Sequence, residues 1–353
     1  MEPVIVVGAG ISGIACARVL QAAGVPVVVE DRGHRIGGRM ATRTLGGRPV
    51  DTGASYLTVT DDAFGAVVGD WQRRGLARPW TETFTVLSAA EPPTSKSGPV
   101  RWGTAGGIRT LVEDLAAGLD VRRHEVQRVT SGPEGLAVDG RPAPAVVLAM
   151  PDAQARRLLV DGPDDEPRRG LEPTTAVLDR GSEPVLAVTA TFERRTWDHV
   201  SDPDPFHGAF VNDDDVLGWI ADDGRRRGDD APVLVGHSTG AFAASRLEDP
   251  PAARDALVAA LVRLLDVGQE PVETHVQRWS LAKPTGEREA THHLDITVGG
   301  GLLGVCGDGW GPASKVEGAW LSGYRLGEAL VERLVDPPAA DGHAPGVAGP
   351  DRH

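Results

Sequence analysis

The sequence predicts an α/β protein in which a nucleotide-binding domain, discontinuous in sequence, carries an inserted α+β domain with an antiparallel sheet. Three observations lead to this fold class. The first 30 residues have the pattern of a strand, a glycine turn, a helix and a second strand. Short apolar segments at hairpin spacing follow in the middle of the chain. A buried strand and a long helix then return between residues 302 and 334.

The N-terminal patterns predict a βαβ unit. Val4–Val7 is a continuous apolar run of mostly β-branched residues, which is typical of a parallel strand buried on both faces. Ile11–Ala23 is apolar and alanine-rich, and Gly24 provides a helix stop. Val25–Glu30 reads as a second buried strand. Because parallel strands need a crossover connection, this unit predicts the start of a parallel sheet.

The central part of the chain predicts loops followed by short strands. Ala77–Trp80 and the Pro- and Ser-rich Leu87–Val100 indicate a loop and an exposed connection, and the charged, proline-rich Asp161–Pro173 indicates a boundary. An antiparallel sheet is predicted from Pro184–Phe192, Ala209–Val211, Val216–Ala221 and Val233–His237. The other predicted strands are Val121–Val129, Leu136–Val138, Ala145–Ala149 and Leu302–Cys306, and the other predicted helices are Leu111–Leu119, Ala252–Leu265 and Trp320–Leu334.

These elements divide the chain into two domains and a tail. Residues 1–60, 101–160 and 290–335 are predicted to form the nucleotide-binding domain. Residues 61–100 and 161–289 are predicted to form the substrate domain. Residues 336–353 are rich in Pro, Ala, Gly and Asp, which predicts a disordered tail.

The composition limits the partners and the location of this chain. The 353 residues, 41% of them hydrophobic and 24% charged, are typical of a globular protein. A net charge of −14 argues against nucleic acid as a partner. No apolar run is long enough to cross a membrane, and the N-terminus lacks the pattern of a signal peptide. The only two cysteines rule out a disulfide framework and favour a cytoplasmic location.

A glycine fingerprint lies where the first strand meets the first helix. Residues 8–13 match G-x-G-x-x-G. Gly8 permits the tight turn, Gly10 lets the backbone approach a pyrophosphate, and Gly13 lets the helix pack close to the strand. The helix N-terminus, which includes Ser12, offers free N–H groups to phosphates. The fingerprint predicts a Rossmann-type domain, and by itself it fits FAD and NAD equally well.

An acidic pair and a second glycine motif narrow the choice of cofactor. Glu30 lies twenty residues after Gly10, and its carboxylate can accept hydrogen bonds from a ribose diol. Asp31 begins a short linker to the run 37–39, which consists of Gly37, Gly38 and Arg39. This order resembles the second signature of the FAD-dependent amine oxidase superfamily. The resemblance implies FAD, with Asp31 among the residues that bind it, the two glycines close to its pyrophosphate and the arginine on the flavin side.

Later segments extend this resemblance over residues 3–335. Residues 50–56 resemble the segment near the isoalloxazine ring, which places Ala54 at the cofactor, and residues 124–129 resemble the strand in which Val126 holds the adenine. Residues 149–151 resemble the family's strand exit. Asp308 lies in the late glycine–aspartate motif, and Val316 opens the last helix, whose amides would face the flavin. Neither cysteine lies where relatives attach FAD covalently, so we expect noncovalent FAD.

Within the superfamily the chain most resembles the renalases. Residues 102–108, 234–239, 277–279 and 307–310 have counterparts in that family, in the same order. This resemblance implies hydride transfer from an isomeric dihydro-NAD(P) to the flavin, with O₂ as acceptor and H₂O₂ as product. Candidate pocket residues are Tyr56, His237 and Trp279.

Other interpretations stay open at this point. One is a flavin amine oxidase or dehydrogenase acting on a small amine or a biosynthetic intermediate, and another is a flavin-binding protein without turnover. Residues 236–240 match the hydrolase motif G-x-S-x-G, but an antiparallel strand is the wrong setting for it. His237 and Trp279 are also compatible with purely structural roles. Adjacent His292 and His293 would point to opposite faces of a strand, so we predict no metal site.

Overall fold

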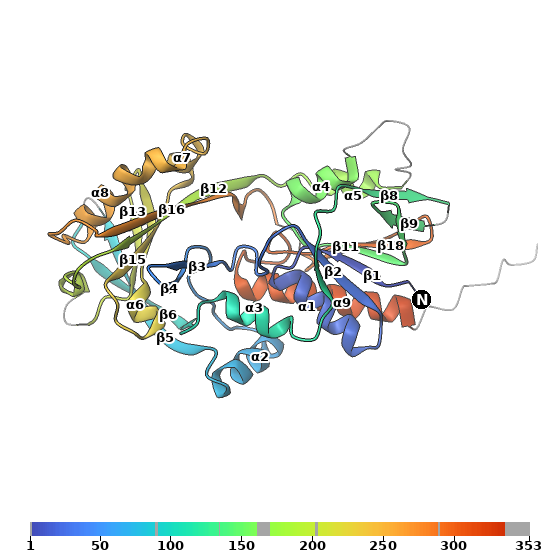
Figure 1. Cartoon of the computed structure of the whole chain (residues 1–353), viewed down its shortest axis with the longest axis horizontal. Helices are drawn as coiled ribbons and strands as arrows, with labels where there is room; N and C mark the ends of the chain where they lie inside the picture. The colour runs from blue at the N-terminus through green and yellow to red at the C-terminus, as the bar shows by residue number, and fades with distance from the viewer. Residues whose placement is uncertain are drawn as a thin grey trace, which may run out of the picture.

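The computed structural model describes residues 2–88, 91–133, 135–160, 170–201, 204–288 and 290–335. The predicted tail and most of the predicted boundary at 161–173 lie outside these residues. Figure 1 shows an elongated molecule with one large sheet towards each end and a hairpin, β3–β4, between them. The predicted α/β class with a Rossmann-like part and an antiparallel sheet is confirmed.

The first large sheet has six strands in the order β17-β18-β11-β1-β2-β7. All neighbours pair in parallel except β17 and β18. The strands are β1 (Val4–Val7), β2 (Val27–Asp31), β7 (Val121–Arg123), β11 (Ala145–Leu148), β17 (Leu294–Val298) and β18 (Gly301–Val305). The predicted strand Val121–Val129 is therefore too long, since β7 ends at Arg123 and the chain then runs irregularly to β8.

Helices cover one face of this sheet, and a small sheet with two helices covers the other (Figure 1). The first layer contains α1 (Ile11–Ala22), α2 (Asp62–Arg73), α3 (Arg109–Leu115) and α9 (Val316–Val335). The second contains β8 (Val129–Gly132), β9 (Gly135–Val138), β10 (Arg141–Ala143), α4 (Asp152–Val160) and α5 (Glu172–Val177).

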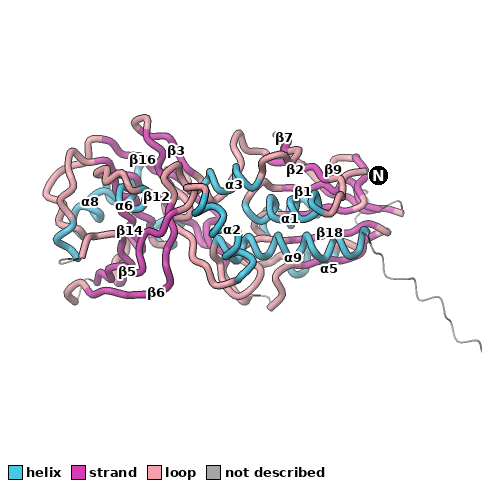
Figure 2. Tube along the Cα trace, turned by 90° about the horizontal axis from the view of Figure 1, so that it is seen from below, coloured by secondary structure: helices cyan, strands magenta, loops and turns pink. Residues whose placement is uncertain are grey.

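The first and last helices touch along their length, as Figure 2 shows from below. Two glycines on α9 make this contact possible. A Cβ on Gly323 would lie 1.8 Å from the carbonyl oxygen of Ser12, and one on Gly327 would lie 2.7 Å from the Cβ of Val19. No larger residue fits between these helices, so the C-terminal helix closes directly onto the N-terminal βαβ unit.

The second large sheet has seven strands in the order β16-β12-β15-β14-β13-β5-β6, and only the β13–β5 pair is parallel. The strands are β5 (Arg78–Ser88), β6 (Thr94–Gly103), β12 (Ser182–Thr191), β13 (Gly208–Asn212), β14 (Leu217–Asp222), β15 (Val233–Ser238) and β16 (Glu273–Pro284). The helices α7 (Gly240–Ala244) and α8 (Arg254–Leu264) pack on one face with an apolar core. The other elements are α6 (Asp223–Arg227), β3 (Thr42–Leu45), β4 (Arg48–Asp51) and the 3-10 turns Asp198–Ser201 and Pro250–Ala253.

Two predicted connections are strands. The predicted loop at Ala77–Trp80 and most of the predicted connection at Leu87–Val100 belong to β5 and β6, which form an antiparallel hairpin at the sheet edge. An edge strand tolerates proline and carries polar residues on both faces. Residues 94–99 are all exposed, so they lack the apolar alternation that marks a strand in sequence.

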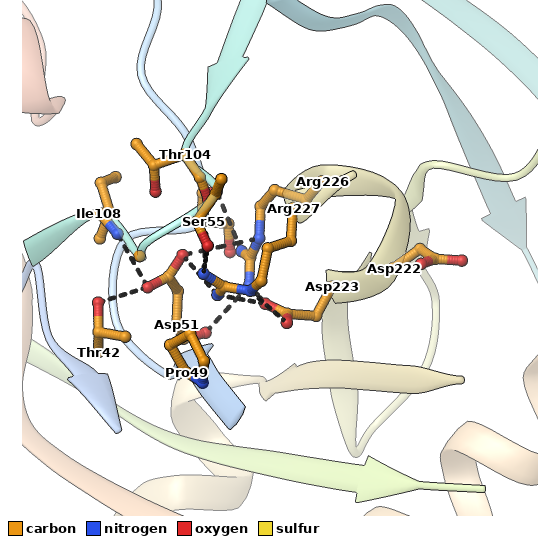
Figure 3. A network of polar contacts seen from close by, with 12 residues as sticks. Thr42, Pro49, Asp51, Ser55, Thr104, Ile108, Asp222, Asp223, Arg226 and Arg227 are labelled. Carbon is orange, nitrogen blue, oxygen red and sulfur yellow. Dashed lines mark hydrogen bonds and ion pairs between the residues drawn. The ribbon is translucent and has the colours of Figure 1, made fainter. Parts of the chain in front are cut away.

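A buried network of charges joins α6 to the β3–β4 hairpin (Figure 3). Asp51, Asp223 and Arg226 are at most 1% exposed, and Arg227 is 4% exposed. Arg227 donates to Oδ2 of Asp51 at 3.2 Å and to both carboxylate oxygens of Asp223 at 3.2 Å. Arg226 pairs with Asp223, and Arg48 pairs with Asp223 from β4. Because every charge has a partner, the network can be buried between the two sheets.

Replacing Asp223 by Asn removes the carboxylate that three guanidinium groups share. Burial raises the pKa of Asp223, but Arg226, Arg227 and Arg48 outweigh burial and hold the pKa below its usual range. We expect Asp223→Asn to lower the free energy of unfolding by about 3–5 kcal/mol, because buried guanidinium groups lose their counter-charge. Urea unfolding at neutral pH measures this loss.

The pH dependence and a control variant check the cause. Because the folded pKa of Asp223 is depressed, its stabilisation is present above the unfolded pKa of about 4 and declines as the pH falls below that value. The Asn variant should therefore lose less stability on acidification than the parent. Asp229→Asn removes a more exposed pair with Arg48 and should cost less than about 1 kcal/mol. Equal losses in the two variants would contradict this account of the network.

Candidate functional site

A cavity of about 720 Å³ lies at the carboxyl ends of the parallel strands, between the two large sheets. The N-termini of α1 and α9 both open onto it. Twelve predicted cofactor residues line this one cavity, and they are Gly8, Gly10, Ser12, Glu30, Asp31, Gly37, Gly38, Arg39, Ala54, Val126, Asp308 and Val316. Residues that are up to 308 positions apart in sequence therefore meet at one site.

The glycine turn is shaped by close backbone contacts. Gly8 has a φ of +110°, and a Cβ there would lie 2.5 Å from the carbonyl oxygen of Ala149. A Cβ on Gly13 would lie 2.0 Å from the carbonyl oxygen of Gly8. Gly13 does not line the cavity, which fits its predicted role of letting the helix approach the strand. Gly10 has open space around it, so its backbone is accessible to a bound phosphate.

The two acids after β2 have different surroundings. Glu30 is 1% exposed, and both its oxygens accept hydrogen bonds from Arg141, at 2.6 and 2.7 Å. The carboxylate of Asp31 accepts from the amides of Ala9 and Gly33, each at 2.7 Å. Asp31 thus holds the glycine turn to the end of β2, while Glu30 is held by Arg141, and both acids line the cavity.

Arg39 and Asp308 meet as an ion pair across the cavity. Nη1 of Arg39 donates to Oδ2 of Asp308 at 3.1 Å and to the carbonyl oxygen of Ala282 at 3.1 Å. Ser314 donates to the same carboxylate at 2.5 Å. The pair therefore links the Gly37–Gly38 turn, the loop after β18 and strand β16 of the seven-stranded sheet.

These features fit a dinucleotide cofactor. The cradle at Gly8 and Gly13 admits no side chain, two helix N-termini face one elongated cavity, and a buried acid stands at the end of β2. Phosphates at helix N-termini gain free N–H donors and a favourable dipole. The site residues that continue past the turn to Arg39, Ala54 and Val316 would hold a second, extended part of the molecule. The residues present therefore fit FAD.

The three candidate pocket residues do not all reach the cavity. His237 and Trp279 line it, but Tyr56 does not. The Tyr56 ring packs 5.3 Å from the ring of Phe84 and 5.7 Å from that of Trp219, measured between centroids. Burial raises the pKa of the Tyr56 hydroxyl. Tyr56 therefore belongs to an aromatic cluster behind the cavity in this structure.

His237 and Trp279 project from neighbouring parts of the seven-stranded sheet. Ala187 on β12 pairs with His237, and Val185 pairs with Trp279. Since residues two apart on a strand point to the same face, both rings face the cavity side. The indole of Trp279 donates to the carbonyl oxygen of Thr52 at 2.8 Å. Burial, and then the nearby charge of Arg226, lower the pKa of His237 to about 3, so its imidazole is neutral.

Several residues that contact the site from outside the cavity lining were not predicted from the sequence. Arg141 pairs with Glu30 across 111 positions, and no local pattern marks it. The carboxylate of Glu317 is buried and accepts from the amides of Thr60 and Asp61, at 2.6 and 2.8 Å. Arg226 donates to the carbonyl oxygens of Ser55 and Asp51, which end the cavity-lining segment. An acid in the first turn of a helix was the one available signal, and it pointed to Glu317.

The motif at residues 236–240 has no hydrolase geometry. Ser238 ends the antiparallel strand β15, and its hydroxyl accepts from the amide of Leu186 at 3.0 Å and donates to the carbonyl of Thr239 at 2.9 Å. A nucleophile elbow needs a parallel sheet and an exposed hydroxyl.

Within the described residues, no helix combines the length and apolar character needed to cross a bilayer.

Two family models match the chain. One, for an NAD(P)-binding Rossmann-like domain, covers residues 6–70. The other, for flavin containing amine oxidoreductase, covers residues 87–330. The second match extends over more than half of the chain and includes the seven-stranded sheet except most of β5, as well as the late Gly307–Asp308 motif.

Curated relatives match over shorter stretches. A candidate flavin-containing monoamine oxidase of Mycobacterium tuberculosis is 45% identical over 116 residues, which is 32% of this chain and 22% of that protein. A polyamine oxidase of Oryza sativa is 50% identical over 54 residues, 15% of this chain and 11% of that protein. The matched stretch is thus about a fifth or less of the length of these relatives.

Solved structures share the whole fold. Putrescine oxidase with bound putrescine has a TM-score of 0.71 at 18% identity, covering 94% of this chain and 99% of the other. Cyclohexylamine oxidase from Brevibacterium oxydans has a TM-score of 0.72 at 15% identity, covering 95% and 99%. At such low identity these structures bear on the fold alone. The chain belongs to the flavin containing amine oxidoreductase family, and its cofactor is FAD.

Proposed function

We propose that this protein is a renalase-like FAD-dependent oxidase whose substrate is an isomeric dihydronicotinamide dinucleotide. With FAD bound, the flavin would accept a hydride at N5 and pass two electrons to O₂, so that substrate, O₂ and a proton give the nicotinamide cation and H₂O₂. A hydride donor needs orientation more than a general base. The task of the chain's own residues is then to hold a flat ring in place and to exclude water.

The proposal depends on the charge of the cavity face that the seven-stranded sheet supplies, which we call the sheet wall. The sheet wall consists of Val185, His237, Arg278, Trp279, Ser280, Leu281, Ala282 and Lys283. None of these described residues is acidic. A diamine or polyamine carries a second positive charge, which needs a carboxylate partner once it leaves water. In a dihydronicotinamide dinucleotide the ring is neutral and the phosphates are negative. Such a substrate suits the sheet wall better, because the charged residues of this wall, Arg278 and Lys283, are basic.

The sheet wall also has suitable groups for a flat, uncharged ring. The Trp279 indole is fixed by its bond to Thr52, and the side chain of Val185 lies on the same sheet face. Nε2 of His237 is buried without a protein partner. A neutral imidazole can accept or donate one hydrogen bond through Nε2. The carboxamide on a nicotinamide ring has both an N–H donor and a carbonyl acceptor, so it can pair with either form. We therefore propose that His237 and Trp279 orient the substrate.

Oxidation of a small amine is the second candidate. It is favoured by the similarity to proteins described as monoamine, polyamine, putrescine and cyclohexylamine oxidases. A neutral monoamine would also meet no unfavourable charge on the sheet wall.

A third possibility, a flavin-binding protein without turnover, predicts no flavin reduction by any member of either substrate class.

For the cofactor we propose the roles that the sequence predicts. Glu30 would hold the ribose, and Gly10 and Ser12 the pyrophosphate. Arg39 would lie on the flavin side, and Asp308 near the ribityl or pyrophosphate portion. Residues 1–60, 101–160 and 290–335 would form the cofactor domain, and residues 61–100 and 161–289 the substrate domain. A cytoplasmic location completes this proposal.

Anaerobic mixing of the FAD-loaded protein with 6-dihydro-NAD tests the substrate class. We expect prompt bleaching of the flavin absorbance, because the neutral ring can face N5 against the sheet wall. A parallel panel contains 2-dihydro-NAD, putrescine, spermidine and a primary monoamine. Bleaching by the amines alone would replace the first proposal with the second, and bleaching by no compound would support a binding protein without turnover.

Replacing Glu30 by Ala tests the cofactor contact. We expect FAD affinity to fall by about 1–3 kcal/mol, since a buried charged acceptor for the ribose is lost. Titration of apoprotein with FAD, followed by flavin fluorescence, measures the change. Glu125→Ala, at the rim of the same cavity, is the matched control and should change affinity little. Unchanged affinity in the Glu30 variant would show that Arg141, and not a ribose, is the functional partner of this acid.

The protonation state of His237 gives a pH prediction. Its pKa of about 3 lies far below neutrality, so the imidazole stays uncharged between about pH 5 and 8. We expect the rate of anaerobic flavin reduction to show no inflection from His237 in this range. An inflection that is present in the parent and absent in His237→Gln would contradict this prediction.

A further inference from the structure

Arg180 lies beside the cofactor cavity but belongs to none of the motifs described above. It lies between α5 and β12, where the chain leaves the six-stranded half for the seven-stranded sheet. Its guanidinium binds the carboxylate of Asp152 twice, at 2.7 and 3.1 Å, and lies 4.1 Å from the ring centre of Trp310. The Arg180 side chain is only 6% exposed. It is therefore a fixed group in a water-poor setting.

One donor of this fixed guanidinium is unsatisfied. Nη1 of Arg180 is buried and has no hydrogen-bond partner in the protein. A buried donor without a partner is costly, and most such groups are satisfied by protein or by ordered water. The guanidinium of Arg180 cannot turn towards solvent to satisfy Nη1, because Asp152 and Trp310 hold it from two sides.

A small cavity lies next to this guanidinium. Its volume is about 20 Å³, and its lining includes Arg180, Asp152, Trp310 and also Arg39 and Asp308 of the cofactor site. A water molecule needs roughly 10–15 Å³ by this measure and two to four polar partners. The space therefore admits a water and excludes a phosphate or an organic ligand.

The surrounding charges favour the same occupant. Asp308 pairs with Arg39, and its carbonyl oxygen accepts from Arg288. Asp152 is already paired with Arg180. Both carboxylates thus have cationic partners, and the open requirement is one neutral acceptor for Nη1 that can also donate. Water meets this requirement, because a water molecule can accept from Nη1 of Arg180 and at the same time donate to an oxygen of the turn at residues 307–310.

We propose that this cavity is a buried water site, and that Arg180 and its water hold the turn at residues 307–310 so that Asp308 meets Arg39 at the cofactor. Arg180 is a positioning residue in this arrangement, since it acts through Trp310, the water and Asp308. It also anchors the start of β12 at the cofactor site. The proposal rests on FAD binding in the large cavity and is independent of which substrate is oxidised.

A crystal structure of the FAD-loaded protein, at a resolution that defines waters, tests the site directly. The expected result is one water within hydrogen-bond distance of Nη1 of Arg180 and of an oxygen of the turn. An empty cavity, a protein atom bonded to Nη1, or a cofactor oxygen or buffer anion in its place would overturn the water site.

Variants test the positioning role. Arg180→Met keeps much of the side-chain volume and removes every donor, and Arg180→Lys keeps one charged donor. We expect FAD affinity of the Met variant to fall about fivefold or more, with partial rescue in the Lys variant. The readouts are FAD titration of the apoprotein and the thermal midpoint of the same apoprotein. Arg333→Met is the matched control, because it removes an ion pair with Asp295 outside both cavities.

The outcomes separate positioning from stability. Positioning predicts weaker FAD binding in Arg180→Met than in Arg333→Met at a comparable change in thermal midpoint. Equal FAD affinity in the parent and Arg180→Met would overturn the positioning role. If Arg180→Met does not fold, the Lys variant decides the matter, and unchanged FAD affinity in that variant together with an empty cavity in the crystal overturns the proposal.

Discussion

The buried network of Asp51, Asp223, Arg226 and Arg227 is the interaction on which the site depends, because it fixes one half of the molecule to the other. The two acids of the network come from different elements, since Asp51 lies on β4 of the β3–β4 hairpin and Asp223 lies on α6, which follows strand β14 of the seven-stranded sheet. Isolated charges at this depth would be prohibitively costly, so the network forms as a unit or not at all. Arg226 also binds the backbone at residues 51 and 55, which frame the cavity-lining segment. The shape of the cavity is thus a consequence of charge pairing outside it.

The parts predicted from sequence are those whose signal is local. The glycine turn at residues 8–13, the buried β1 and β2 and the long helix at the C-terminus each carry a short pattern that backbone geometry requires. The hairpin β5–β6 was missed, because an exposed edge strand is polar on both faces and so resembles a loop. The predicted strand Val121–Val129 is too long for a related reason. Val126 is buried as a strand residue would be, but it lies in the irregular segment between β7 and β8. A residue that is buried only by tertiary contacts does not follow the hydrophobic periodicity that marks a helix or a strand in the sequence.

The site divides in the same way. Twelve of the predicted cofactor residues line one cavity. Gly8 and Gly13 could be predicted because a glycine turn of this shape admits no Cβ at those positions. Arg141 and Arg226 were not found, since an arginine in a sequence gives no sign of which carboxylate or carbonyl it will meet. Tyr56 is placed differently from these residues. The segment that carries it does line the cavity, but its ring turns into the aromatic cluster with Phe84 and Trp219. Resemblance places a backbone more reliably than it places a side chain.

The contact of α9 with α1 has a consequence for biosynthesis. Gly323 and Gly327 bring the last described helix against the first, and the N-terminus of α9 forms part of the cofactor cavity. During translation the βαβ unit leaves the ribosome before its partner helix, which follows only after about 300 further residues, so this is a contact of very high sequence separation. The nascent N-terminal unit therefore exposes the apolar face of α1 until residues 316–335 have been made. The cofactor cavity is therefore complete only after this segment has been made, because the N-terminus of α9 forms part of its lining.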